Sequence, residues 1–294
     1  EILAILKPSS GETGLDLTLG FGGHMLAMLP LVQPGGRMFG MDVDPIELPR
    51  TAARLRALGF GDDVLTVQRA NFSELAILLP QAGSGFDFVL ADLGVSSMQI
   101  DNPARGFSFR ADGPLDLRLD PTSGQSASEL LLCVTRRRLR DLLMDNADEP
   151  FAEPLAAALQ GQYVETTVKL ADLVRATMEL VYKRNMPAQE RLAETKKVLQ
   201  RTFQALRIEV NDEFGVLDKM LQNLPACLKP GGRVAILSFH SGEDRRVKKC
   251  FQTGERNGTF SSVAPDPVRA SYDEQRSNPR SSSAKLRWAV RAPH

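Results

Sequence analysis

The first hundred residues alternate short apolar runs with helical stretches, and this alternation constrains the fold more than any other feature of the chain. Runs typical of buried strands lie at residues 15–19, 64–70 and 86–94, and another ends near Asp42. Helical patterns separate these runs. Strands that are joined through helices pair in parallel, with right-handed crossovers. The sequence therefore predicts an α/β fold with an open, doubly wound, Rossmann-like sheet.

The alternation stops after residue 101. The segment 102–199 begins as a loop rich in Pro and Gly and continues as helical stretches without a convincing strand. A long helix and two further strands follow, at 203–228, 234–239 and 285–290. The simplest organisation is one α/β domain made of residues 1–101 and 200–294, interrupted by a mainly helical inserted domain at 102–199.

Composition narrows the classes of function. Hydrophobic residues make up 43% of the chain, enough for a sizeable core, and the formal net charge is zero. A nucleic-acid partner would therefore need a local basic patch. Three Cys residues far apart in sequence and three His residues predict neither a disulfide framework nor a metal site. No apolar run reaches the length that spans a membrane, and the start at Glu1 without Met suggests a fragment of a longer protein.

A glycine-rich loop follows the first predicted strand, with glycines at 20, 22 and 23. Glycines there let the backbone approach a ligand at the mouth of a parallel sheet. The NAD fingerprint G-x-G-x-x-G fails because Met25 stands at its last position, and the G-K-[ST] of a phosphate-binding P-loop is absent. A tight structural turn is the alternative interpretation of this loop.

Polar and aromatic residues stand at the ends of the next three strands. Asp42 can accept both hydroxyls of a ribose, Phe72 can stack on a purine, and Asp92 adds a second carboxylate. Taken singly, each has a simpler interpretation: a solvated acid for Asp42, or a core anchor for Phe72. Their conjunction predicts a nucleoside pocket. The missing glycine triplet and the lack of an acid–base pair for hydride transfer favour S-adenosylmethionine over NAD.

Longer motifs carry a specific family resemblance. The stretch LADLGVSSMQIDNPARGFSFRADGPLDLRLD begins at Leu90, and TFQALRIEVNDE, LKPGGRVAILSFHSGEDRRVK and NPRSSSAKLR occur further along the chain. These motifs closely resemble those of the MraW-type ribosomal RNA small-subunit (cytosine-N4)-methyltransferases. The resemblance implies an S-adenosylmethionine-dependent enzyme that methylates N4 of a cytidine in small-subunit ribosomal RNA. It also implies a helical insertion that recognises the substrate.

The resemblance assigns cofactor contacts residue by residue. They fall on Gly22, Gly23, His24, Asp42, Phe72, Asp92 and Gln99. His24 and Gln99 rest on the resemblance alone, and His24 could instead be an ordinary residue of a helix N-terminus. No catalytic base is assigned, and Asp92 and His240 are the candidates. Expected substrate contacts are Asp116, Ser241, Arg245, Arg246, Lys248 and Asn278.

Some of these candidates have simpler interpretations. Asp116 could pair with Arg118 or Arg110, and Asn278 could form an Asx turn before Pro279. The basic run at 245–249 could be a solvated helix face, although the C-terminal third is more basic than the neutral whole. RNA contacts are expected there because phosphate binding needs clustered cations.

The chain also departs from the family pattern. The family usually has T-F-G-R-G-G-H at the glycine loop, where this chain has Phe21 in place of the arginine. Gly242 replaces a leucine, and the inserted segment diverges most.

Other assignments stay open at this point. They include a methyltransferase acting on another RNA base or on a protein, and a ribosome-assembly factor without turnover. The location would be cytoplasmic in a bacterium, and mitochondrial or plastid in a eukaryote. The oligomeric state is not predicted.

Overall fold

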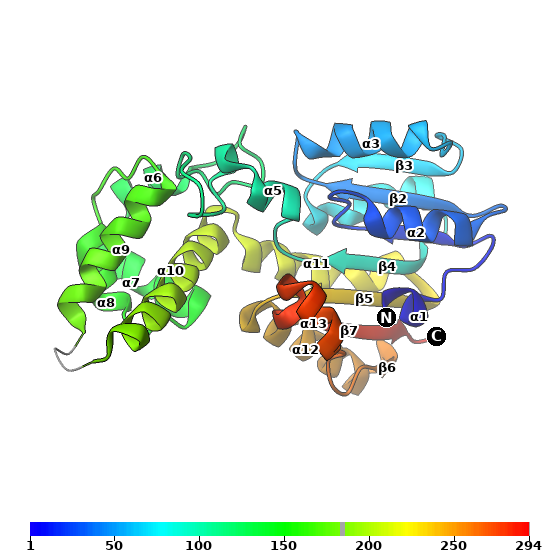
Figure 1. Ribbon diagram of the computed structural model, residues 1–294. Helices are drawn as coiled ribbons and strands as arrows, with labels where there is room; N and C mark the ends of the chain where they lie inside the picture. Colours follow the sequence, from blue (N-terminus) through cyan, green and yellow to red (C-terminus); the bar gives the residue numbers. More distant parts are fainter. Residues whose placement is uncertain (183–185, 294) are drawn as a thin grey trace. The chain divides into compact units, whose positions relative to one another are not determined.

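The computed structural model describes residues 1–182 and 186–293, which form two compact units. One unit joins Glu1–Gly94 to Phe214–His294, and the other is Val95–Glu213. The first combines a sheet with helices, and the second is helical (Figure 1). The helical unit therefore begins earlier than the expected residue 102 and ends later than the expected residue 199.

The larger unit is built around a seven-stranded sheet of order β3-β2-β1-β4-β5-β7-β6. The pairs among β1 to β5 are parallel, whereas β7 runs antiparallel to both β5 and β6. This arrangement confirms the predicted doubly wound α/β class. The strands are β1 (Thr13–Asp16), β2 (Arg37–Asp42), β3 (Leu65–Arg69), β4 (Phe86–Asp92), β5 (Leu228–Ser238), β6 (Phe260–Val263) and β7 (Lys285–Arg291).

Helices of this unit pack on both faces of the sheet, because alternate residues of each strand point to opposite sides. Met38 joins a core with α2 and α3, whereas its neighbour Phe39 joins a core with α11 and α12. The helices are α1 (Ile2–Leu6), α2 (Gly23–Val32), α3 (Glu47–Ala57), η1 (Phe72–Leu78), α4 (Leu79–Ala82), α11 (Glu213–Cys227), α12 (Ser241–Arg256), α13 (Tyr272–Ser277) and η3 (Pro279–Ser283).

The helical unit has its own apolar core, to which α6 to α10 all contribute. Side-chain caps define several of its helix starts: Ser126 and Glu129 form a reciprocal capping box, and Thr135 and Thr166 cap α7 and α9. Its helices are α5 (Ser97–Asp101), η2 (Pro103–Arg105), α6 (Ala127–Cys133), α7 (Arg136–Ala147), α8 (Ala152–Leu159), α9 (Thr167–Val181) and α10 (Ala188–Val210).

Several predicted elements were wrong in detail. The expected helix at 203–228 is two helices, because Asp212 adopts a left-handed φ of 47° between α10 and α11. The first strand ends at Asp16 rather than at residue 19. The helix expected after Asn71 is mostly the 3₁₀ helix η1. The short edge strand β6 was missed because it lies within a polar, Ser-rich stretch.

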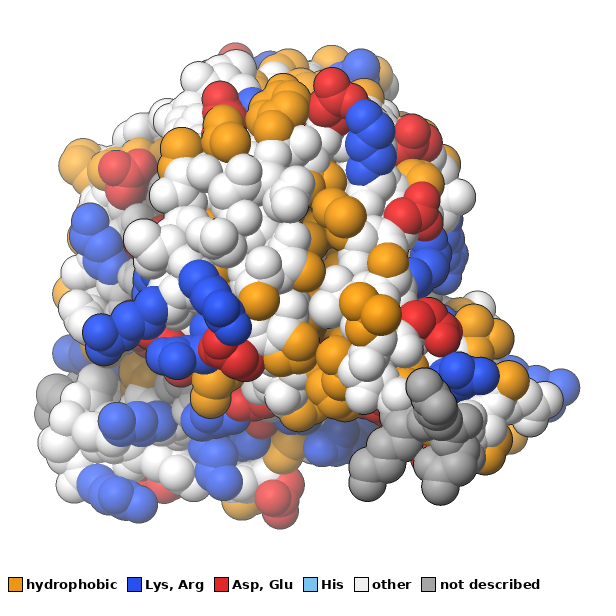
Figure 2. Space-filling view, turned by 90° about the vertical axis from the view of Figure 1, so that its left-hand side faces the viewer, with side chains coloured by type: hydrophobic (Ala, Val, Ile, Leu, Met, Phe, Trp, Pro, Cys, Tyr) orange, Lys and Arg blue, Asp and Glu red, His pale blue; other side chains and the backbone are white. Residues whose placement is uncertain are grey.

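Charged side chains on the surface are unevenly distributed although the net charge is zero. On the face drawn in Figure 2, Lys and Arg side chains are frequent and gather toward the lower left. Local basic surfaces therefore exist despite the overall balance. Within the described residues, no helix combines the length and the apolar character that crossing a bilayer requires.

Candidate functional site

The sheet topology brings three carboxylates to one edge. β1 lies between β2 and β4, so the chain reverses its direction of travel across the sheet at this point. In open α/β sheets, ligands bind outside the carboxyl ends of the strands at such a switch point. Asp16, Asp42 and Asp92 are the last residues of β1, β2 and β4. With His24 of α2, they form what we call the strand-end cluster.

Asp42 holds the glycine loop and also faces the ligand edge. Its Oδ2 accepts a hydrogen bond from the Gly20 N–H at 2.8 Å, and its Oδ1 accepts from the Asp44 N–H at 2.9 Å. Burial raises the pKa of this carboxyl, and the backbone donors oppose that shift. A carboxylate oxygen has more than one lone pair, so Asp42 can still accept from ligand hydroxyls.

Asp16 is the most buried member of the cluster, with 1% of its surface exposed. Its Oδ1 accepts from the Thr18 N–H at 3.1 Å, whereas the buried Oδ2 has no hydrogen-bond partner among the described residues. Burial raises the pKa of Asp16 to about 7, and the nearby carboxylates add to the effect. Asp16 was not predicted as a site residue, because the predicted strand ran from residue 15 to residue 19 and placed Asp16 near its start.

His24 and Asp92 form a pair across the site. The distance from His24 Nε2 to Asp92 Oδ2 is 3.4 Å, and the hydrogen bond to Asp92 raises the pKa of the imidazole. The Asp92 N–H donates to Thr18 Oγ1 at 2.7 Å, which fixes the strand end. Asp92 Oδ1 is buried and has no hydrogen-bond partner within the described part of the chain. The cluster thus offers two unsatisfied carboxylate oxygens.

The glycine loop needs glycine at position 22 and is held by contacts with α3. Gly22 has a φ of 77°, and a Cβ there would lie 2.9 Å from Thr51 Cγ2. The Thr51 hydroxyl donates to the Gly20 carbonyl at 2.6 Å. At the loop tip, the guanidinium carbon of Arg54 lies 3.5 Å from the ring centroid of Phe21. Helix α3 therefore holds a loop in which Phe21 stands where the family usually has arginine.

The two other expected cofactor residues lie in different units. Phe72 begins η1 and packs partly buried against the core of the sheet unit, next to the end of β3. Gln99 lies in α5 of the helical unit, where it is buried and its Oε1 accepts from the Ser96 N–H at 2.8 Å. The structure thus supports a core role for Phe72 and a capping role for Gln99, and their contacts with a cofactor stay predictions.

Helix α12 carries most of the expected substrate residues. His240 is its N-cap residue, and its Nε2 lies 3.2 Å from Glu243 Oε1. Ser241 is the exposed first residue of the helix. The helix face beyond it presents three exposed cations: Arg245, Lys248 and Lys249.

Arg246 differs from these neighbours. Its guanidinium carbon lies 3.6 Å from the Phe214 ring centroid, and its Nε is 3.3 Å from Asp218 Oδ2. A Cβ on Gly242 would lie 2.5 Å from the Phe214 ring, so the replacement of leucine by Gly242 makes room for this stack. Arg246 is therefore held by protein groups.

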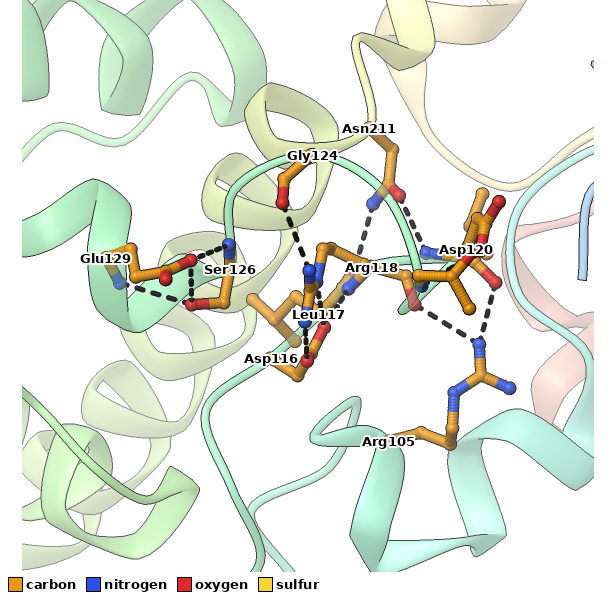
Figure 3. A network of polar contacts seen from close by, with 11 residues as sticks. Arg105, Asp116, Leu117, Arg118, Asp120, Gly124, Ser126, Glu129 and Asn211 are labelled. Atoms are coloured by element: carbon orange, nitrogen blue, oxygen red, sulfur yellow. Dashed lines mark hydrogen bonds and ion pairs between the residues drawn. The ribbon is translucent and has the colours of Figure 1, made fainter.

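The last two expected substrate residues are Asp116 and Asn278. Asp116 pairs with Arg118 through both carboxylate oxygens, at 2.8 and 2.6 Å, inside the polar network in Figure 3. Asn278 is exposed between α13 and η3, and its carbonyl accepts from the Ser281 N–H and hydroxyl. The structure therefore shows the alternative interpretation for Asp116, which is a structural ion pair.

Known proteins are similar to this chain over nearly its whole length. The family model described as the MraW methylase family matches residues 1–292. A protein of Lachnoclostridium phytofermentans named "Ribosomal RNA small subunit methyltransferase H 1" is 49% identical, over 99% of this chain and 80% of its own length. A protein of Synechococcus sp. named "Ribosomal RNA small subunit methyltransferase H" is 40% identical, over 99% and 92%. A solved SAM-dependent methyltransferase from Aquifex aeolicus, 10% identical over 99% and 88%, has a TM-score of 0.41, too low to carry an argument.

The buried Asp16 carboxyl makes the stability of the ligand-free protein depend on pH. Its pKa is about 7 in the folded chain and near the ordinary value in the unfolded chain, so the unfolded state loses the proton first. Stability therefore falls as pH rises from about 4 through 7. We expect Asp16→Asn to remove this loss and to raise the free energy of unfolding, relative to the wild type, by on the order of 2 kcal/mol more at pH 8 than at pH 5.

Urea unfolding at the two pH values measures this difference. Asp63→Asn, at an exposed acid, is the matched control and should show no such pH dependence. An equal effect of Asp16→Asn at both pH values would contradict the assigned burial of the carboxylate.

Proposed function

This chain belongs to the MraW methylase family, and on that premise we propose that it methylates N4 of a cytidine in small-subunit ribosomal RNA. The methyl donor is S-adenosylmethionine, and the chain is a methyltransferase. The curated relatives described above carry small-subunit ribosomal RNA in their names, which supports the choice of substrate. The assignment of cytosine N4 as the methylated atom comes from the motif resemblance. The observation that carries the proposal is the strand-end cluster.

The residues of the cluster fit the charge of this cofactor. S-adenosylmethionine has a cationic sulfonium and a cationic ammonium group against a single carboxylate. Asp16 and Asp92 each hold a buried oxygen that has no hydrogen-bond partner among residues 1–182 and 186–293, and acceptors of this kind suit a cationic ligand. Asp42 would accept the ribose hydroxyls, and Phe72 would lie against the adenine ring. Gly22 and Gly23 would let the backbone approach the amino-acid end of the cofactor. A Cβ on Gly23 would meet no protein atom, so the space beside this residue is open.

The reaction is mainly a problem of positioning. When bound, the cofactor supplies an electrophilic methyl group. The exocyclic amine of cytosine is a poor nucleophile because its lone pair is delocalised into the ring, so the protein must hold that nitrogen in line with the methyl group. An acceptor near the amine assists by taking the departing proton. Asp92 Oδ1 and His240 are the candidate acceptors, and neither is assigned as the catalytic base.

Helix α12 offers the best-supported RNA surface. Arg245, Lys248 and Lys249 are exposed along it, and phosphate contacts of this kind dominate the affinity of proteins for nucleic acids. By contrast, Lys285 and Arg287 lie 3.2 and 2.6 Å from Asp244, so both form ion pairs within the protein. We therefore place the RNA contacts of the C-terminal third on α12, and propose that the helical unit adds further recognition.

The alternatives receive less support. A ribosome-assembly factor that binds only RNA, without turnover, has no need of the buried carboxylates at the switch point of the sheet, and one that also binds the cofactor is distinguished by the absence of methyl transfer. A methyltransferase for another base or for a protein would share the same cofactor site, so only its product distinguishes it. The named relatives come from bacteria, which supports a cytoplasmic location among the alternatives.

Asp92 provides a first test of the cofactor site. We expect Asp92→Asn to weaken S-adenosylmethionine binding about tenfold or more, because the variant keeps the shape of the side chain but loses its charge. Calorimetric titration gives the affinity, and turnover at saturating cofactor is measured in parallel. Full affinity with lost turnover would contradict the binding role and assign Asp92 to proton transfer instead.

The RNA surface is tested by charge reversal. We expect the triple variant Arg245→Glu, Lys248→Glu, Lys249→Glu to weaken binding to small-subunit RNA by at least about tenfold, with a shallower dependence on salt. Filter binding at several salt concentrations measures both quantities. Lys219→Glu, on α11 of the same unit, is the control for nonspecific charge effects. RNA binding that does not respond to the triple variant would exclude α12 from the interface.

The reaction itself is tested by methyl transfer from labelled S-adenosylmethionine to small subunits that lack the modification. Digestion to nucleosides and mass spectrometry then identify the product. We expect N4-methylcytidine at a single site. Label on another base, or on protein, would overturn the assigned specificity and leave the cofactor assignment intact.

A further inference from the structure

The helical unit contains a second candidate binding site, formed by residues that the functions above do not use. A cavity of about 140 Å³, open to solvent, lies between α5 and the loop that follows η2. We call it the 100–111 notch. Its lining residues are Ile100, Asp101, Pro103, Ser108, Arg110 and Ala111.

An alternating segment builds one wall of the notch. Phe107 and Phe109 pack against the core of the helical unit, and the ring centroids of Phe109 and Phe203 are 5.1 Å apart. The intervening Ser108 and the following Arg110 line the notch instead. The two phenyl rings therefore anchor the segment while the polar side chains face the cavity.

Close backbone contacts fix the loop around the notch. A Cβ on Gly113 would overlap the Pro103 carbonyl oxygen, and a Cβ on Gly106 would overlap the Pro114 carbonyl oxygen. The Thr167 hydroxyl of α9 donates to the Ala111 carbonyl at 3.3 Å. Both ends of the loop are thus held against neighbouring backbone.

The polar network in Figure 3 links η2, which borders the notch, to the loop at 116–120. The Arg105 guanidinium donates to the carbonyls of Arg118 and Leu119 at 3.2 and 2.8 Å. Asn211 donates to the Leu117 carbonyl at 2.8 Å and accepts from the Leu119 N–H at 2.7 Å. Leu117 is held at a φ of 64°, a conformation that costs a branched side chain about 1–3 kcal/mol. This strain lies in the neighbouring loop at 116–120, which Arg105 links to η2.

The size and chemistry of the notch indicate what it binds. Pockets for whole drug-sized ligands are usually about 300–1,000 Å³, so this cavity suits one ring of a longer ligand. Ile100, Pro103 and Ala111 offer an apolar surface against which a flat ring can pack. Ser108 and Asp101 add polar atoms beside that surface. The exposed guanidinium of Arg110 has the fork geometry that binds phosphate.

We propose that the 100–111 notch binds one nucleotide of the RNA substrate, with the base against Ile100 and Pro103 and the adjoining phosphate on Arg110. This assignment rests on the proposed function, because it takes the long ligand to be RNA. The notch gives the helical unit a defined role in substrate binding that does not involve the cofactor.

Two substitutions test the notch without disturbing the core. Ala111→Trp fills the cavity from an exposed position, and Arg110→Gln removes the cation. Each should raise the KM for undermethylated small subunits about tenfold and leave S-adenosylhomocysteine affinity unchanged. Arg110→Gln should also lower the salt slope of RNA binding by about one. Arg175→Gln, on α9 of the same unit and paired with Asp172 at 2.7 Å, is the matched control.

The outcomes separate the two proposals. Methyl transfer by the wild type with unchanged KM in both variants would overturn the notch assignment alone. A wild type that binds S-adenosylhomocysteine but neither binds nor methylates RNA would overturn the proposed function, and the notch assignment with it. Thermal melts and S-adenosylhomocysteine binding confirm that each variant is folded, and Ser108→Ala provides a milder third variant with an expected KM increase of a few fold.

Discussion

The main physical constraint on this structure is the free-energy cost of placing three carboxylates at one partly buried edge of a parallel sheet. Asp16, Asp42 and Asp92 end neighbouring parallel strands, so all three lie at the same edge of the sheet. Burial raises the pKa of Asp16 and of Asp42, and like charges nearby raise both further. Backbone donors from Thr18, Gly20 and Asp44 offset part of this shift. A cationic cofactor can interact with the two carboxylate oxygens that have no hydrogen-bond partner among the described residues, Asp16 Oδ2 and Asp92 Oδ1.

The sequence predicted this site where strand ends could be located. Asp42 closes a strand whose end was placed correctly, and Asp92 lies two residues before the predicted end of its strand, so the rule that ligands bind at carboxyl ends selected both as candidates. Asp16 escaped the same rule because the apolar residues Leu17 and Leu19 follow it and are also buried. Burial of a loop cannot be distinguished from burial of a strand by hydrophobicity alone. His24 was found only through family resemblance, because its partner Asp92 lies far away in sequence.

Other features depended on contacts that no local pattern encodes. The break between α10 and α11 rests on one left-handed residue, Asp212, in a continuous helical pattern. The basic run on α12 looked uniform in sequence, yet Arg246 is stacked on Phe214 while Lys248 and Lys249 are exposed. Gly242 permits that stack, so a departure from the family pattern is matched by a local packing change. The polar network around Leu117 likewise becomes visible only when Asn211 is brought to the loop.

The two units differ in the kinds of surface that their architecture provides. A parallel sheet concentrates helix starts and strand ends at one edge, which suits a small charged cofactor. The helical unit offers the 100–111 notch with the exposed Arg110, whereas the exposed cations of α12 belong to the sheet unit. On the proposed assignments, the residues that bind the methyl donor and those that contact RNA are different sets, so substitutions in one set should leave the other intact.

The most direct test of the cluster is a count of the protons that cofactor binding releases. S-adenosylmethionine has one net positive charge more than S-adenosylhomocysteine, so it should favour the ionised form of Asp16. Calorimetric titration near pH 7 in buffers of different ionisation enthalpy measures the release. The account predicts release of about half a proton with S-adenosylmethionine, because Asp16 has a pKa of about 7, and no such release in Asp16→Asn. Binding without proton release in the wild type, or equal release in Asp16→Asn, would contradict it.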